Sequence, residues 1–211
     1  MIPNKIHYCW FGNNPKPDLV KRCIESWQRF NYEIIEINDE LVSSLSPYID
    51  VLDSEPRFVR QAREQRKWAY VADYWRFRFL YTHGGFSLDA DVELVKSLDP
   101  YRQHSFVSGQ EVNGQVLITA TMGAVPNHPF CQLVIDYYDC LDEFQPIPNT
   151  KFLTKLLQLF VKKQALDKTL YLHGNGVLYP SDIFCPYDHR RRKIIMSPRT
   201  VAIHHFQGSW K

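Results

Sequence analysis

The chain has 211 residues, 45% of them hydrophobic and 23% charged, and its formal net charge is +2. These values are typical of a soluble globular protein, so we expect residues 1–211 to form a single domain with a substantial core. The small net charge argues against nucleic acid as a partner, and five cysteines without a CxxC pair argue against a zinc knuckle or a disulfide framework.

The first forty residues alternate between strand and helix patterns. An apolar, aromatic run over residues 6–11 predicts a buried strand, and the Gly-Asn-Asn-Pro sequence that follows predicts a loop. Residues 18–30 carry apolar side chains four apart, which predicts an amphipathic helix with Asp18 as its N-cap. Residues 32–37 predict a second strand, and this strand–helix–strand order indicates a parallel sheet in an α/β fold.

The next segments predict loops with a short helix over residues 38–56. One long helix without internal Gly or Pro is expected over residues 56–83, ended by Gly84-Gly85. A strand over residues 86–88 then runs into Asp89-Ala90-Asp91.

The second half of the chain has weaker patterns. Residues 106–125 are β-like, and helices are expected over residues 129–144 and 152–163. Residues 170–179 are strand-like or irregular, and residues 194–196 predict a short strand.

Asp89 and Asp91 are the main candidates for a functional site. On an extended backbone, residues two apart point to the same side, so the two carboxylates would repel each other without a cation between them. Carboxylate oxygens suit Mg²⁺ or Mn²⁺, and such an ion can bridge the two phosphates of a nucleotide-sugar and stabilise the leaving group. Two solvated acids in a turn would give the same motif, but the preceding helix, Gly-Gly stop and strand favour the site.

Four segments of the sequence together resemble glycosyltransferase family 32, the DXD sugar-binding family. They are IPNKIHYCWFG (2–12), KWAYVADYWR (67–76), GGFSLDADVE (84–93) and AIHHFQGSW (202–210). The family includes bacterial capsule and lipopolysaccharide transferases. The resemblance implies a GT-A fold, a Rossmann-like domain with a central mixed, mostly parallel sheet flanked by helices. It also implies a divalent metal, a nucleotide-sugar donor and retention of configuration at the anomeric carbon.

The resemblance also assigns roles to individual residues. Asp73 and Arg76, one helical turn apart, would bind the donor, Asp73 through sugar hydroxyls and Arg76 through the sugar or the diphosphate; the alternative is an ion pair within the helix. Asp91 would be the direct metal ligand, and Asp89 would contact ribose, sugar or a metal-bound water. Glu93 is expected outside the first set of ligands.

Aromatic and tail residues complete the expected site. Trp10 with Tyr8 would stack on the nucleobase, with core packing as the alternative. In the tail, His205 is favoured over His204 as a metal ligand, and Ser209 and Trp210 would contact the metal or phosphates as the tail closes over the donor. Thr150 and residues 174–176 would line the acceptor side.

Two other functions compete with this interpretation. A haloacid-dehalogenase-like phosphatase also uses DxD, but near the start of its fold and with Thr or Val where this chain has Glu93. The second is an inactive nucleotide-sugar-binding module, against which the intact Asp pair argues.

The donor is expected to be a UDP-sugar rather than a GDP-sugar, and the acceptor a glycan or a lipid-linked saccharide. Residues 1–8 do not form a signal peptide, and no apolar run reaches the ~20 residues of a membrane span. We therefore expect a cytoplasmic protein that contacts the inner face of a bacterial plasma membrane peripherally. Two basic clusters support this contact: Arg57, Arg60, Arg63, Arg66 and Lys67, and then Arg190, Arg191, Arg192 and Lys193.

Overall fold

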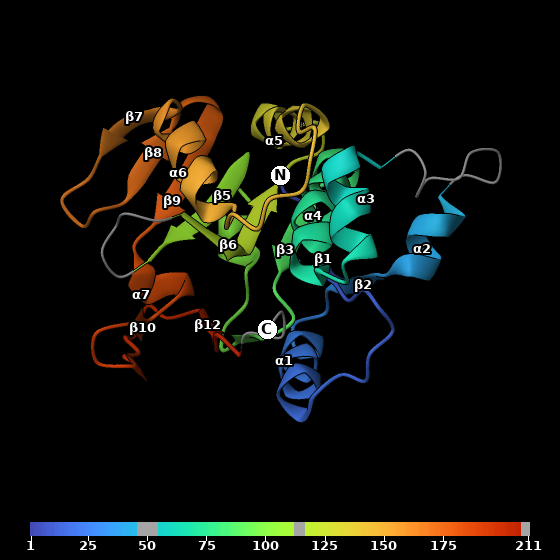
Figure 1. Ribbon diagram of the computed structural model, residues 1–211. Helices are drawn as coiled ribbons and strands as arrows, with labels where there is room; N and C mark the ends of the chain where they lie inside the picture. Colours follow the sequence, from blue (N-terminus) through green and yellow to red (C-terminus); the bar gives the residue numbers. More distant parts are fainter. Residues whose placement is uncertain (46–54, 112–116, 208–211) are drawn as a thin grey trace.

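The structure is a computed structural model that describes residues 1–45, 55–111 and 117–207, without the side chains of residues 117–119. A central eight-stranded sheet organises the fold (Figure 1). In spatial order its strands are β2 (Glu33–Ile37), β1 (Lys5–Cys9), β3 (Gly85–Leu88), β6 (Leu117–Ala124), β5 (Phe106–Gln110), β9 (Gly176–Tyr179), β8 (Leu170–Leu172) and β7 (Val161–Gln164).

The sheet is mixed, with most strands in one direction. Neighbours β1–β2, β1–β3 and β5–β9 are parallel, and the other four neighbouring pairs are antiparallel. Following these orientations across the sheet, only β6 and β8 run opposite to the other six strands. The expected α/β fold is therefore confirmed, including the first parallel unit, in which β1 and β2 flank α1 (Asp18–Gln28).

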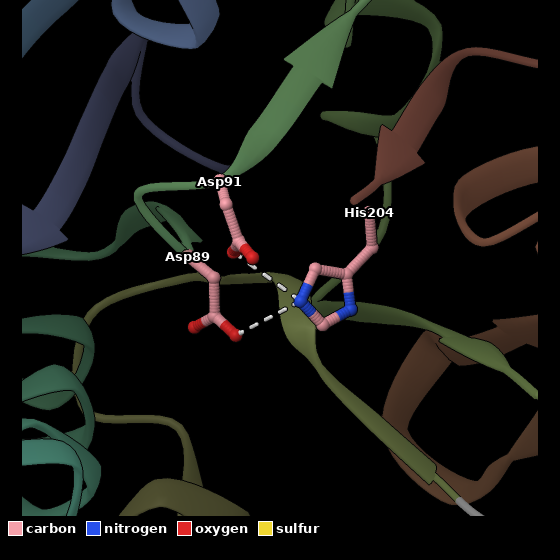
Figure 2. A group of neighbouring side chains, drawn as sticks. All are labelled: Asp89, Asp91 and His204. Atoms are coloured by element: carbon pink, nitrogen blue, oxygen red, sulfur yellow. Dashed lines mark ion pairs between the residues drawn. The ribbon is translucent and has the colours of Figure 1, made fainter. Parts of the chain in front are cut away.

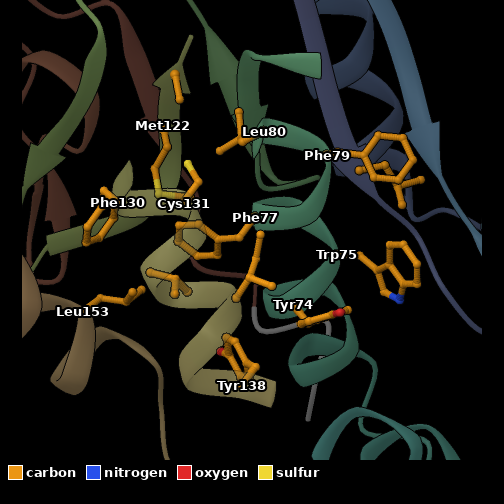
Figure 3. Packing of buried hydrophobic residues seen from close by; sticks show 14 of the residues in the cluster. Tyr74, Trp75, Phe77, Phe79, Leu80, Met122, Phe130, Cys131, Tyr138 and Leu153 are labelled. Atoms are coloured by element: carbon orange, nitrogen blue, oxygen red, sulfur yellow. The ribbon is translucent and has the colours of Figure 1, made fainter. Parts of the chain in front are cut away.

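Apolar side chains cover both faces of the sheet because successive strand residues point to opposite sides. Phe106 belongs to the core on one face and its neighbour Val107 to the core on the other. The first core contains side chains of α3 (Arg57–Glu64), α4 (Trp68–His83), α5 (Pro129–Asp139) and α6 (Thr150–Gln158). Figure 3 shows its centre, where Phe77 of α4 packs edge-on against Phe130 of α5 at 6.1 Å.

The opposite core is built from α1, α7 (Ser181–Phe184) and a small two-stranded sheet. That small sheet pairs β4 (Val92–Leu94) with β12 (Ala202–His204) in antiparallel orientation. Trp27 of α1 is fully buried there and donates its indole N–H to the Val92 carbonyl at 2.8 Å. The tail of the chain is thereby fixed beside the segment that follows Asp89 and Asp91.

The remaining elements are short. They are α2 (Asp39–Ser44), the 3₁₀ turns Asp99–Tyr101 and His173–Asn175, and a hairpin of β10 (Tyr187–Asp188) with β11 (Lys193–Ile194). Within the described residues, no helix combines the length and the apolar character that crossing a bilayer requires.

Several expected helix boundaries were wrong. The segment expected as one helix over residues 56–83 is two helices, α3 and α4, separated at Arg66, where φ is +55°. Asp18 is the first helical residue rather than the N-cap, because Pro17 holds the cap position without a side-chain hydrogen bond. The helices expected to end at residues 144 and 163 end at Asp139 and Gln158, and residues 161–164 form β7 instead.

Candidate functional site

Asp89 and Asp91 lie in a tight turn at the carboxyl end of β3. The amide of Asp89 donates to the Ala120 carbonyl at 2.8 Å, and the Val92 amide donates back to the Asp89 carbonyl at 3.0 Å. The two carboxylates therefore come together through a turn. The expected extended backbone over residues 89–91 is not found. In open α/β sheets ligands bind beyond the carboxyl ends of strands, which is where this turn lies.

His204 approaches the two acids from the tail of the chain. Strand β12 places His204 opposite Val92, immediately after Asp91. Its Nε2 lies 3.3 Å from Asp91 Oδ1 and 3.8 Å from Asp89 Oδ2, as Figure 2 shows. Asp89, Asp91 and His204 each offer one ligand atom, and these atoms all lie within 4.8 Å of one another.

The charges of this cluster are strongly coupled. Burial alone would lower the pKa of His204, but its hydrogen bond to Asp91 and the neighbouring charges raise it to about 10. Burial opposes ionisation of Asp91, yet His204 and the Gln207 amide, which donates to Asp91 Oδ2 at 2.8 Å, hold the pKa of Asp91 below its ordinary value. A protonated His204 thus offsets part of the negative charge of the two acids, mainly that of Asp91, to which it lies closer.

Asp73 and Arg76 of α4 extend the cluster on the helix side. Arg76 is 7% exposed, and its guanidinium lies 2.7 Å from Asp89 Oδ1 and 3.7 Å from Asp73 Oδ1. Burial raises the pKa of Asp73 to about 7, with Asp89 adding to the rise and Arg76 opposing it. Asp73 and Arg76 of the helix therefore form one continuous polar cluster with Asp89 and Asp91, although the two pairs were predicted separately from the sequence.

Asn149 is a further member of this cluster that the sequence analysis did not single out. It is 6% exposed, immediately precedes α6, and its amide lowers the pKa of Asp73. Its neighbour Thr150 was expected to line the acceptor side instead. A polar residue directly before a helix can be recognised in the sequence as a candidate cap. That Asn149 lies near Asp73 of α4 is visible only in the fold.

Tyr8 and Trp10 differ in their surroundings. Tyr8 is 5% exposed, packs edge-on against Trp27 at 5.4 Å and donates its hydroxyl to Glu36, so it is a core residue. Trp10 is half-buried beyond the end of β1, and its indole N–H donates to the Asn14 carbonyl at 2.7 Å. The expected stacking on a nucleobase is therefore corrected for Tyr8, whose ring is covered, and stays a prediction for Trp10.

His205 was expected to be the metal ligand beside Asp89 and Asp91, but the structure places His204 there instead. His205 Nε2 lies 3.0 Å from Glu93 Oε2, while its amide donates to the Asp91 carbonyl at 3.1 Å. Neighbouring strand residues point to opposite sides, so only one of the two histidines can face the acids. Ser209 and Trp210 lie outside the described residues.

The donor atoms of the cluster fit a divalent cation. Two carboxylate oxygens are suited to Mg²⁺ and Mn²⁺, and an imidazole nitrogen is more typical of transition metals, so the set favours Mn²⁺ over Mg²⁺. His204 has to lose the proton on Nε2 before this nitrogen can bind a metal, so the cation and the proton compete for the same atom.

Comparison with known proteins shows that the chain is similar to glycosyltransferases. The family described as the glycosyltransferase sugar-binding region containing the DXD motif matches residues 17–107, which include Asp73, Arg76, Asp89 and Asp91 but not His204. An uncharacterized glycosyltransferase, L373, of Acanthamoeba polyphaga mimivirus is 28% identical over 144 residues. The match covers 65% of this chain, which spans about half (54%) of the length of that relative.

Two solved structures were compared with this chain. PaToxG glycosyltransferase superposes with a TM-score of 0.56 at 17% identity, over 75% of this chain and 69% of its own. A glycosyltransferase involved in the glycosylation of the major capsid of PBCV-1 has a TM-score of 0.47 at 10% identity, over 95% and 93% of the two chains. The first likeness supports the GT-A type of α/β fold.

Proposed function

We propose that this chain is a glycosyltransferase of the DXD type that transfers a hexose from a nucleoside-diphosphate sugar to a glycan or lipid-linked saccharide. The observation that carries the proposal is the meeting of Asp89, Asp91 and His204 beside Arg76. A polar cluster of this composition binds a diphosphate and a cation together. A UDP-sugar is the proposed donor, and surface polysaccharide synthesis the proposed setting.

The residues of the cluster have different roles in the proposed reaction. Asp91 is fixed by the Gln207 amide and, with Asp89 and His204, would hold Mn²⁺. When bound, that ion supplies positive charge that stabilises the departing diphosphate. The Arg76 guanidinium adds a second, permanent cation, and its planar fork suits phosphate oxygens.

Asp73 contributes a carboxyl group that can accept or donate hydrogen bonds to sugar hydroxyls. Its raised pKa of about 7 lets both protonation states be populated near neutral pH. No other group of the cluster is placed as a strong general base, and the family resemblance implies retention of configuration, in which the leaving phosphate accepts the acceptor's proton. We therefore propose a retaining transfer that depends on positioning and charge stabilisation.

The proposal is tested by incubating the protein with a panel of UDP- and GDP-sugars, with and without Mn²⁺, and measuring released sugar and nucleotide. We expect metal-dependent hydrolysis of one UDP-sugar and its loss in Asp89→Asn. Hydrolysis of p-nitrophenyl phosphate without action on any nucleotide-sugar would support a phosphatase instead. Tight nucleotide binding without turnover on any donor would support an inactive binding module.

A further inference from the structure

The hairpin of β10 and β11 presents an unusual run of exposed side chains. Residues 189–196, with the sequence HRRRKIIM, are all exposed. Four cations, Arg190 to Lys193, are followed directly by Ile194, Ile195 and Met196, which are 38%, 42% and 54% exposed. We call residues 187–196 the basic–apolar hairpin.

The backbone of this hairpin is ordered by its own hydrogen bonds. Tyr187 pairs with Ile194, and Asp188 pairs with Lys193. Asp188 Oδ1 accepts the amides of Arg190 and Arg191 at 2.9 and 3.1 Å, and the Ile195 amide donates to the Pro186 carbonyl at 2.7 Å. The exposed side chains therefore project from a fixed scaffold.

Acidic neighbours do not neutralise the hairpin. Asp188 lies 3.7 Å from Arg191, and Glu111 lies 3.5 Å from His189. Arg190, Arg192 and Lys193 add three further positive charges to this tip. The surface is therefore strongly cationic and apolar at once.

Aromatic contacts connect the hairpin to the Asp89–Asp91–His204 cluster. The rings of Tyr187 and His189 lie 4.9 and 5.0 Å from the ring of Phe206. Phe206 in turn lies 3.9 Å from the ring of His204. Whatever binds the hairpin is consequently held next to the proposed donor site.

We infer that the basic–apolar hairpin docks the protein on an anionic lipid bilayer and holds the cluster at that surface. The cations match the charge of anionic headgroups, and the isoleucines and the methionine can enter the boundary between headgroups and acyl chains. An acidic polysaccharide or a nucleic acid would be matched by the cations but would leave the three apolar side chains in water. The inference goes beyond the proposed function, because docking does not require the transfer reaction.

The test is co-sedimentation of the full chain with vesicles of phosphatidylcholine, with or without phosphatidylglycerol. We expect binding only when phosphatidylglycerol is present. Arg190→Glu/Arg192→Glu/Lys193→Glu should lower the partition coefficient by about a hundredfold or more, given the contribution of each cation near an anionic surface. The variant should keep the wild-type melting temperature and donor hydrolysis in solution.

A matched control carries the same change of charge elsewhere. Arg57→Glu/Arg66→Glu/Lys67→Glu alters exposed positions at the two ends of α3, in the other basic cluster that was expected to support membrane contact. The apolar residues of α3 are buried, so we expect this variant to bind vesicles within about threefold of wild type. An equal loss in both triple variants, or no binding of wild type to phosphatidylglycerol, would overturn the inference.

The apolar part is tested by Ile195→Ser/Met196→Ser, which keeps every charge. We expect its vesicle binding to disappear in high salt, where wild type retains part of its binding through apolar burial. If this variant binds vesicles as wild type does, and both bind dextran sulfate more tightly, the hairpin is a site for an acidic polymer and the membrane assignment is wrong.

Discussion

Arg76 is the residue on which the charge balance of the cluster depends. It is the buried cation between Asp73 and Asp89, and it lowers the pKa of Asp73. Removing it leaves two partly buried carboxyl groups without their shared partner, which is costly in a poorly solvated site. Lysine keeps the charge but cannot span both acids with a planar fork.

We therefore predict that Arg76→Lys lowers the rate of donor hydrolysis about a hundredfold or more, and that Arg76→Ala also lowers the melting temperature. Arg78→Ala, an exposed position on the same helix, is the control and should behave as wild type. Steady-state hydrolysis and thermal unfolding check both variants. If Arg76→Lys hydrolyses the donor as fast as wild type, the guanidinium of Arg76 has no role in the site.

For single residues, the sequence predicted which residues belong to the site better than it predicted which of them contact one another. The pairing of Asp73 with Arg76 follows from helical spacing, and the structure brings them to Asp89. The choice between His204 and His205 could not be made from the sequence, because it depends on the register of β12 against β4. Asn149 was missed for a similar reason, since its contact with Asp73 is made between segments 76 residues apart.

Among the elements, the break between α3 and α4 has a specific local cause. The amide of Lys67 donates to the Ala62 carbonyl at 2.8 Å, and the amide of Arg66 donates to the Arg63 carbonyl at 2.9 Å. With Arg66 at positive φ, these two bonds form a Schellman motif, which ends a helix. The left-handed residue of this motif is usually glycine, so an arginine there gave no sequence signal.

We predict that Arg66→Gly stabilises the protein by about 1 kcal/mol, because glycine adopts positive φ without the steric cost of a side chain. Chemical denaturation measures the change in unfolding free energy. Arg66→Ala separates the effect of charge from that of backbone conformation and should give no such gain. If Arg66→Gly is destabilising, the helix break does not depend on this residue's left-handed conformation.

The first three strands of the central sheet were predicted more reliably than the helix ends, whereas β7 was expected to be helical. β1, β2 and β3 have apolar runs bounded by loop residues, and all three were found where the sequence indicated. After the helix end at Asp139, the Phe144 amide makes a tertiary hydrogen bond to the Gln61 side chain, whereas after Gln158 the chain turns locally, with the Phe160 amide donating to the Leu157 carbonyl. Such bonds cannot be predicted from periodicity.

For the whole molecule, His7 makes stability depend on pH. It is fully buried in β1 and donates its Nε2–H to the Gly84 carbonyl at 2.7 Å, so β1 is tied to the end of α4. Burial lowers the pKa of His7 from 6.5 to about 4. The unfolded chain therefore binds a proton below pH 6.5 that the folded protein excludes, and stability must fall as the pH decreases from about 6.5 to about 4.

We predict that this single group contributes a loss of roughly 3 kcal/mol across that window, at ~1.4 kcal/mol for each unit of pKa difference. His7→Gln keeps a donor for the Gly84 carbonyl but does not titrate, so its free energy of unfolding should fall less over the same range. Denaturation at several pH values compares the two proteins. Identical slopes would show that His7 is protonated in the folded state.

The arrangement of the whole chain also explains why the site is assembled from distant segments. Strand β3 lies between β1 and β6 in the sheet, α4 packs on one face, and β12 returns on the other face to pair with β4. Asp89, Asp91 and His204 consequently meet although His204 lies more than a hundred residues after the two acids in the sequence (Figure 2). The sheet order and the pairing of β12 with β4 are tertiary features; the sequence predicted the α/β class, the first parallel unit and, by resemblance, the GT-A type of fold and a tail near the donor site.

The central claim is that Asp91 and His204 bind a divalent cation, and titration of Mn²⁺ followed by electron paramagnetic resonance tests it directly. We predict that wild type binds Mn²⁺ and that Asp91→Ala and His204→Ala each weaken binding by about tenfold or more, whereas His205→Ala stays within about threefold. Unchanged Mn²⁺ affinity in Asp91→Ala, or a loss in His205→Ala with none in His204→Ala, would contradict the assignment.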